Sequence, residues 1–159
     1  MTNHLAIIAC SKGKIWDYFN DLGPVEAGCA YSGPEFLLAK HYVSKLSDRI
    51  IILSAKYGFL DLRDIISGFY DITFARKEDK CIDSAGLYQQ AREKELFNYK
   101  TLTIVANQIY QNKIYEVFAK TNISIDCPVK GIMDEKKLCI EINKLILRTT
   151  FKTANLPNL

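Results

Sequence analysis

Four short apolar runs predict the strands of the protein. They cover residues 5–9, 50–53, 102–105 and 123–125, and polar or turn-forming residues bound each of them. The first two runs are continuous rather than alternating, which is typical of strands covered on both faces of a sheet. We therefore expect these strands to lie inside a parallel sheet.

Segments with helical spacing of apolar residues separate the predicted strands. They cover residues 35–46, 84–97, 108–118 and 134–147. Pro34 suits the opening of the first helix, and Ser84 and Asp134 suit the N-caps of the second and fourth. The alternation of strand and helix predicts a three-layer α/β fold, with a mainly parallel four-stranded sheet and helices on both faces.

The length of 159 residues favours one domain, which we place at residues 1–149 with a loose tail at 150–159. A hydrophobic content of 48% with 25% charged residues is ordinary for a globular protein and excludes a mainly disordered chain. No apolar run is long enough for a membrane-spanning helix, so no membrane partner is expected. The first residues lack the features of a signal peptide, which predicts a cytoplasmic protein.

Several classes of chemistry lack their sequence signatures. The five cysteines are scattered without a Cys-x-x-Cys pair and only two histidines occur, which argues against a zinc site, a disulfide framework and His-dependent catalytic triads. Dinucleotide-binding glycine motifs and the nucleophile elbow are also absent. We therefore expect no metal and no cofactor. The net charge of +3 is only a weak preference for anionic partners.

Two long connections follow the first and second predicted strands, at residues 11–33 and 54–78. Ligands of open parallel sheets bind at the carboxyl ends of strands, and long loops there are usually functional. We therefore predict that Ser11, Lys56 and Asp71 surround a shared cavity at this edge.

The first connection carries candidate anion-binding and stacking groups. Ser11, Lys12 and Lys14 offer a hydroxyl and two amines at a strand end, and they are either an anion site or a polar surface turn. Tyr31 either stacks on a base or fixes the loop to the core, while Ser32 can donate a hydrogen bond. Cys10 is either a buried structural thiol or a thiolate nucleophile.

The second connection carries the candidate catalytic groups. Lys56 lies in the segment Ser54-Ala55-Lys56-Tyr57-Gly58, where its amine either holds a phosphate or leaving anion or is a surface charge. Asp71 follows Tyr70 and is either a general base, a stabiliser of an oxocarbenium-like transition state, or a turn residue. After the third strand, Asn107 suits a helix N-cap, although its amide can also read a base edge.

These motifs together resemble a family of uncharacterised bacterial, archaeal and phage domains. The resemblance rests on Cys10-Ser11-Lys12, Tyr31-Ser32-Gly33, the Ser-Ala-Lys-Tyr/His-Gly signature at residues 54–58, and Tyr70-Asp71. The family is distantly similar to the uracil-DNA-glycosylase-like fold, to the accessory domain of archaeosine synthases and, more remotely, to the YaaA peroxide-stress proteins.

The resemblance implies a nucleobase pocket at the carboxyl edge of the sheet. Its recurring polar and aromatic positions match Ser11, Tyr31, Lys56, Tyr57, Tyr70 and Asp71. Two departures stand out: the lysine after Ser11 comes early, with Lys14 as the alternative equivalent, and Ala106-Asn107 replaces a glycine motif before Tyr110. The Gly-Gln-Asp-Pro-Tyr motif of uracil-excising enzymes is absent, so we do not expect uracil excision from DNA.

We therefore expect an enzyme that cleaves or exchanges an N-glycosidic bond in a nucleotide or nucleic acid. Asp71 and Lys56 are the expected catalytic residues. The expected partner is a nucleobase, nucleotide or nucleic acid, and the sequence leaves the oligomeric state open. The alternative is a non-catalytic module that binds a nucleotide or nucleic acid. The expected binding residues are Ser11, Lys12, Lys14, Tyr31, Ser32, Ser54, Tyr57, Gly58, Tyr70 and Asn107.

Overall fold

The computed structural model describes residues 3–154. Its main sheet has five strands in the order β4-β3-β1-β6-β7, where β1 in the centre pairs in parallel with β3 and β6, and β6 pairs in parallel with β7. The strands are β1 (His4–Ala9), β3 (Arg49–Ser54), β4 (Gly58–Asp61), β6 (Thr101–Val105) and β7 (Ser124–Asp126). The predicted α/β class is confirmed.

The expected number of four strands is wrong, because β4 adds an antiparallel edge strand beside β3. It follows a tight turn after Ser54, in the segment that we expected to be a loop. Gly58 begins β4 with a φ of 78°, a left-handed conformation that glycine adopts without strain. The turn places Ser54 opposite Gly58 and Leu53 opposite Phe59 in the ladder.

A two-stranded ribbon joins the two long connections to each other. The strand β2 (Val25–Glu26) belongs to the first connection and β5 (Ile65–Ile66) to the second, and the two pair antiparallel. This pairing brings residues 11–33 and 54–78 together beside the sheet.

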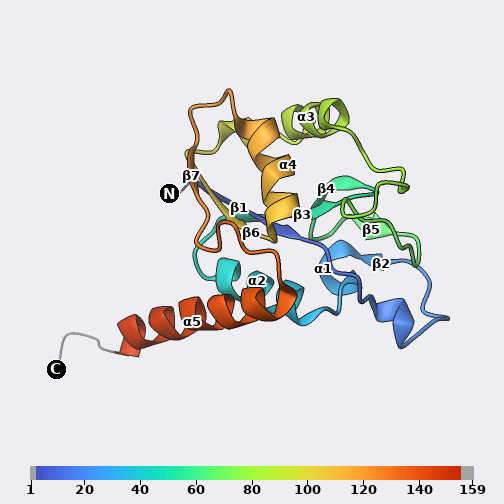
Figure 1. Cartoon of the computed structure of the whole chain (residues 1–159), viewed down its shortest axis with the longest axis horizontal. Helices are drawn as coiled ribbons and strands as arrows, with labels where there is room; N and C mark the ends of the chain where they lie inside the picture. The colour runs from blue at the N-terminus through green and yellow to red at the C-terminus, as the bar shows by residue number, and fades with distance from the viewer. Residues whose placement is uncertain (1–2, 155–159) are drawn as a thin grey trace.

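Helices cover both faces of the sheet, as predicted (Figure 1). Helices α2 (Pro34–Ser44) and α5 (Glu135–Ala154) lie on one face, while α3 (Ser84–Glu93) and α4 (Gln108–Phe118) lie on the other. Shorter elements are α1 (Ala27–Ala30), η1 (Ile15–Asp17) and η2 (Leu96–Asn98).

The alternation of side chains along β1 divides the interior into two cores. Ala6 and Ile8 pack in the core beneath α2 and α5, whereas Leu5 and Ile7 pack in the core beneath α3 and α4. All four side chains are fully buried. A strand that feeds two cores needs apolar residues at every position, which is why its sequence is a continuous apolar run.

The helix boundaries correct two predictions and confirm one. Asp83, not Ser84, caps α3, since its carboxylate accepts the Gly86 amide at 2.8 Å. Asp134 accepts the Lys137 amide at 2.9 Å at the start of α5, as expected of an N-cap. Helix α5 runs to Ala154 instead of ending at Leu147. The expected tail therefore begins inside this helix, and its residues 155–159 lie outside the described part of the chain.

The strand order places a crevice between β1 and β6. The connection that leaves β1 leads to β3 on one side, whereas the connection that leaves β6 leads to β7 on the other. Such a reversal leaves room for a ligand outside the carboxyl ends of the two strands. Within residues 3–154, no helix has the length and apolarity needed to cross a membrane.

Candidate functional site

A cavity of about 240 Å³ lies at the carboxyl ends of β1 and β6, and we call it the switch-point cavity. Residues from both long connections and from the first turns of α2, α4 and α5 line it. The lining consists of Ala9, Cys10, Ser11, Lys12, Lys14, Glu35, Asp71, Ile72, Thr73, Arg76, Asn107, Tyr110, Glu135 and Leu138.

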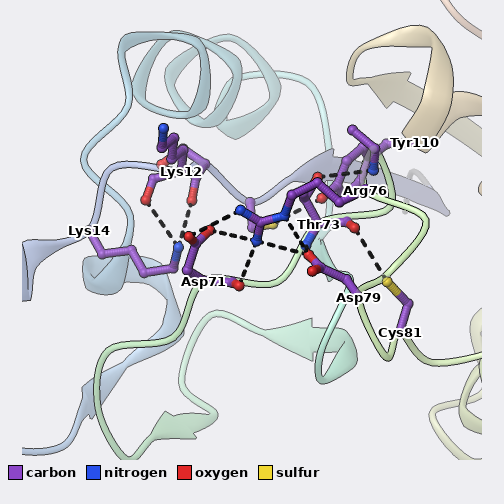
Figure 2. Close-up of polar contacts among 11 residues, drawn as sticks. Lys12, Lys14, Asp71, Thr73, Arg76, Asp79, Cys81 and Tyr110 are labelled. Atoms are coloured by element: carbon purple, nitrogen blue, oxygen red, sulfur yellow. Dashed lines mark hydrogen bonds and ion pairs between the residues drawn. The ribbon is translucent and has the colours of Figure 1, made fainter.

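One arginine holds the candidate catalytic carboxylate in this cavity (Figure 2). The Nη1 and Nη2 atoms of Arg76 donate to the two carboxylate oxygens of Asp71 at 3.2 and 3.0 Å. On its other edge, the Nε atom of Arg76 donates to Asp79 at 2.9 Å. Asp79 also accepts the main-chain amide of Thr73 at 2.8 Å, which closes the loop around the arginine.

The Arg76 guanidinium holds the pKa of Asp71 below that of an ordinary aspartate. Asp71 is exposed and therefore remains a hydrated carboxylate at neutral pH. A carboxylate with a lowered pKa is a weak proton acceptor, because general bases work best with a pKa near the working pH. Its negative charge suits electrostatic stabilisation of a cation better than it suits deprotonation of water.

The two lysines of the first connection occupy different environments. Lys12 is exposed at the rim of the cavity, whereas Lys14 is only 3% exposed. The Lys14 amine donates to the main-chain carbonyls of Lys12 and Ser11 at 3.0 and 3.2 Å. Burial lowers the pKa of the Lys14 amine.

Ser11 lines the cavity, but internal hydrogen bonds occupy its hydroxyl. The hydroxyl donates to the Gly13 carbonyl at 2.7 Å and accepts the Gly33 amide at 3.0 Å. These bonds fasten the turn after β1 to the start of α2. The structure therefore gives Ser11 a role in shaping the turn.

Cys10, Tyr110 and Asn107 line the switch-point cavity where β1 and β6 end. The Cys10 thiol donates to the Tyr110 hydroxyl at 3.8 Å, and burial raises the pKa of the thiol. A raised pKa disfavours the thiolate, which is the reactive form, and this opposes the nucleophile interpretation. Asn107 caps α4 through its side-chain oxygen, which accepts the Tyr110 amide at 3.2 Å. This confirms its predicted cap, and Asn107 is also one of the residues that line the cavity.

The tyrosines expected to stack on a base are part of the core. Tyr31 and Tyr70 are 2% and 5% exposed, and their hydroxyls bond to each other. Tyr70 also bonds to the Ser54 hydroxyl at 2.8 Å. Ser54 in turn accepts the amides of Lys56 and Tyr57, at 3.2 and 3.1 Å. The structure supports the packing interpretation of Tyr31, and neither buried ring offers a face to a base.

The remaining candidates lie outside the lining of the cavity. Lys56 is exposed, with its amine 5.0 Å from the ring centroid of Tyr57 and 5.5 Å from that of Tyr70. Gly58 begins β4 directly after the β3–β4 turn, and Ser32 lines a neighbouring surface groove with Lys12. The expectation of one cavity thus holds for Ser11 and Asp71 but not for Lys56, which is not among the residues that line it.

Sequence reasoning missed several residues of the cavity. Arg76 could not be recognised in the sequence, because it lies five residues after Asp71 in a loop. That spacing is typical of neither a helix nor a strand. Glu35 and Glu135 look like ordinary first-turn acids of two helices, yet both reach the same cavity. Within residues 3–154, no group of three His, Cys, Asp or Glu side chains is arranged to hold a metal ion.

Two comparisons with known proteins identify the family of the chain. Residues 5–140 match a family described as a family of unknown function (DUF6884). The chain is also similar to the uncharacterized protein YfjM of Bacillus subtilis (strain 168), with 35% identity over 116 residues, or 73% of this chain and 77% of that protein. The matched range includes every residue that lines the switch-point cavity. The chain therefore belongs to the DUF6884 family.

Proposed function

We propose that the switch-point cavity binds a nucleobase-containing molecule and that the protein hydrolyses or exchanges its N-glycosidic bond. The observation that carries this proposal is the ionised Asp71 carboxylate, held by Arg76 in a small cavity at the β1–β6 crevice. The resemblance to the uracil-DNA-glycosylase-like fold and to the archaeosine synthase accessory domain supports the nucleobase class.

The size of the cavity favours a single nucleobase or nucleoside. Its volume of about 240 Å³ is below the roughly 300–1,000 Å³ of pockets for drug-sized ligands. A base within a duplex would have to be flipped out of the stack to enter it. We therefore place the susceptible base in the cavity and any attached phosphate at its rim.

The polar groups of the cavity suit the charges of this reaction. Breaking an N-glycosidic bond leaves positive charge on the sugar and negative charge on the departing base. Asp71 supplies the anion for the sugar, while the exposed Lys12 amine and Arg76 supply cations for the base or a phosphate. The amide nitrogen of Asn107 is a donor for the edge of the base.

The experiment is a base-release assay on a panel of nucleosides and 5′-nucleotides, with free base measured by chromatography. Asp71→Asn should lower turnover by about 10²–10³-fold, the loss typical of one electrostatic group, and leave ligand affinity nearly unchanged. Asp21→Asn is the control and should leave turnover unchanged, because Asp21 is an exposed aspartate that does not line the cavity. Equal turnover of Asp71→Asn and the unaltered protein would refute the assignment.

The second candidate function is binding without catalysis. It is favoured by the bidentate pairing of Asp71 with Arg76, which neutralises the carboxylate. This candidate requires Lys12 but not Asp71, and it predicts salt-sensitive binding without release of base. Lys12→Ala should weaken binding, whereas Lys56→Ala, which removes an exposed lysine outside the cavity, should not.

A further inference from the structure

Lys14 is a buried lysine inside the switch-point cavity. Among the described residues, no carboxylate oxygen lies within ion-pair distance of its amine. Lysines are almost never so deeply buried without a charged partner. The ring of Tyr70 covers the amine, with its centroid 4.5 Å from Nζ.

The neutral form of Lys14 can make both of its hydrogen bonds. Its two acceptors are main-chain carbonyls, those of Ser11 and Lys12, and a neutral amine has two N–H groups to give them. The nitrogen lone pair then remains free. Burial is the largest influence on the pKa of Lys14 and lowers it, although the Asp71 carboxylate acts in the opposite direction. Buried lysines with this property serve as nucleophiles toward carbonyl groups.

We propose that the Lys14 amine forms an imine with the C1′ aldehyde of a sugar bound in the switch-point cavity. This inference rests on the proposed function, since cleavage of an N-glycosidic bond leaves a hemiacetal carbon that opens to an aldehyde. The substrate class is therefore an abasic sugar, either free or in a nucleic acid strand.

The proposed step needs only water as a co-product. The Nζ lone pair adds to the carbonyl carbon, and the oxygen of the resulting carbinolamine gains the proton that nitrogen loses. Expulsion of that hydroxyl as water, with loss of the second amine proton, forms the C=N bond. Addition of one water reverses these steps and releases the aldehyde. No oxidant or reductant takes part.

The other lysines near the site are poor candidates for this chemistry. Lys12 is exposed at the rim of the cavity, so the surrounding chain does not fix the position of its amine. Lys56 is exposed as well and lies outside the lining. Adduct formation should therefore concentrate on one of the many lysines of the chain.

The test is reductive trapping with the full-length protein. The protein is incubated with an oligonucleotide that carries one abasic site, in the presence of sodium cyanoborohydride, which reduces an imine to a stable secondary amine. We expect an adduct of about one oligonucleotide per chain, located at Lys14 by peptide mass mapping. A parallel incubation with 2-deoxyribose 5-phosphate distinguishes a strand from a free sugar as the preferred source of the aldehyde.

Two variants complete the experiment. Lys14→Arg should abolish the adduct, whereas Lys120→Arg, which alters an exposed lysine at the end of α4, should leave its yield unchanged. If Lys14→Arg fails to fold, the peptide map of the unaltered chain still shows which lysine carries the adduct. An adduct spread over surface lysines, or equal trapping in Lys14→Arg, would overturn the inference.

The outcomes separate this inference from the proposed function, because the abasic sugar is supplied ready-made. Base release without trapping at Lys14 would leave the glycosidase proposal standing and remove the imine. Trapping at Lys14 without release of base from any nucleoside would support the imine and remove the glycosidase proposal.

Discussion

Arg76 binds Asp71 by three hydrogen bonds, two to the carboxylate and one of 2.7 Å to the main-chain carbonyl of the same residue. The guanidinium thereby fixes both the side chain and the backbone of the carboxylate that lines the switch-point cavity. Because Asp79 holds the other edge of the guanidinium, the position of Asp71 depends on a residue that does not itself line the cavity.

Removal of this arginine should change the pH dependence of the site. Arg76 lowers the pKa of Asp71, so the carboxylate stays ionised until the pH falls through that lowered pKa. In Arg76→Gln, Asp71 should become protonated at a higher pH, and the acid limb of base release should move to higher pH. A ¹³C NMR titration of the Asp71 carboxyl group measures the shift directly.

The control for this prediction is Arg92→Gln, which removes an exposed arginine of α3 that does not line the cavity. It should leave the titration unchanged. An Asp71 that titrates identically in Arg76→Gln and in the unaltered protein would show that the ion pair does not set its ionisation.

Gly58→Ala should destabilise the protein more than Gly23→Ala. Both glycines have a positive φ, of 78° and 75°, so both substitutions carry roughly 1–2 kcal/mol of backbone strain. A Cβ at Gly58 would also lie 2.0 Å from the Gln90 Oε1 atom, whereas nothing lies within 4 Å of one at Gly23.

The additional cost at Gly58 comes from displacing Gln90, whose side chain binds Phe59 and Tyr57 in the β3–β4 hairpin. Loss of these partly buried hydrogen bonds should cost about 1 kcal/mol. Urea unfolding of the two variants measures the difference. Equal free energies of unfolding would show that displacing Gln90 adds no cost at Gly58.

Tyr70→Phe should lower the free energy of unfolding by about 1–3 kcal/mol, because it leaves the buried hydroxyls of Tyr31 and Ser54 without a shared partner. Tyr31→Phe removes the other hydroxyl of the hydrogen bond between Tyr31 and Tyr70. The double variant should lose less than the sum of the two single variants, since coupled hydroxyls do not act independently. Strict additivity in thermal or urea unfolding would show that the chain of hydroxyls is not coupled.

Ile142→Ala and Ile140→Ala test how α5 packs. Ile142 is fully buried beneath the sheet, and its truncation should cost about 2–5 kcal/mol. Ile140 is 55% exposed on the same helix, and its truncation should change stability by no more than about 0.5 kcal/mol. Similar losses in urea unfolding would mean that the exposed side of α5 is covered in solution.

The local sequence pattern specifies the alternating strands and helices of the fold. Because β1 and β3 are covered on both faces, their sequences are continuous apolar runs, and both strands lie where the pattern predicted. The helices followed from local periodicity, and Asn107 and Asp134 cap their helices through bonds three residues ahead. Such features depend on neighbours in the chain, so the sequence carries them directly.

Contacts between distant parts of the chain determine which polar groups meet. Lys14 became a buried amine and Lys56 an exposed one, although the two looked alike as lysines after a strand. Tyr31 meets Tyr70 from a distance of 39 residues, and the β2–β5 ribbon unites two connections that are separate in the chain. Burial and pairing of this kind depend on groups distant in sequence, and no local spacing encodes them. The pattern could therefore predict the edge of the sheet that holds the cavity, but only the folded chain selected the residues that line it.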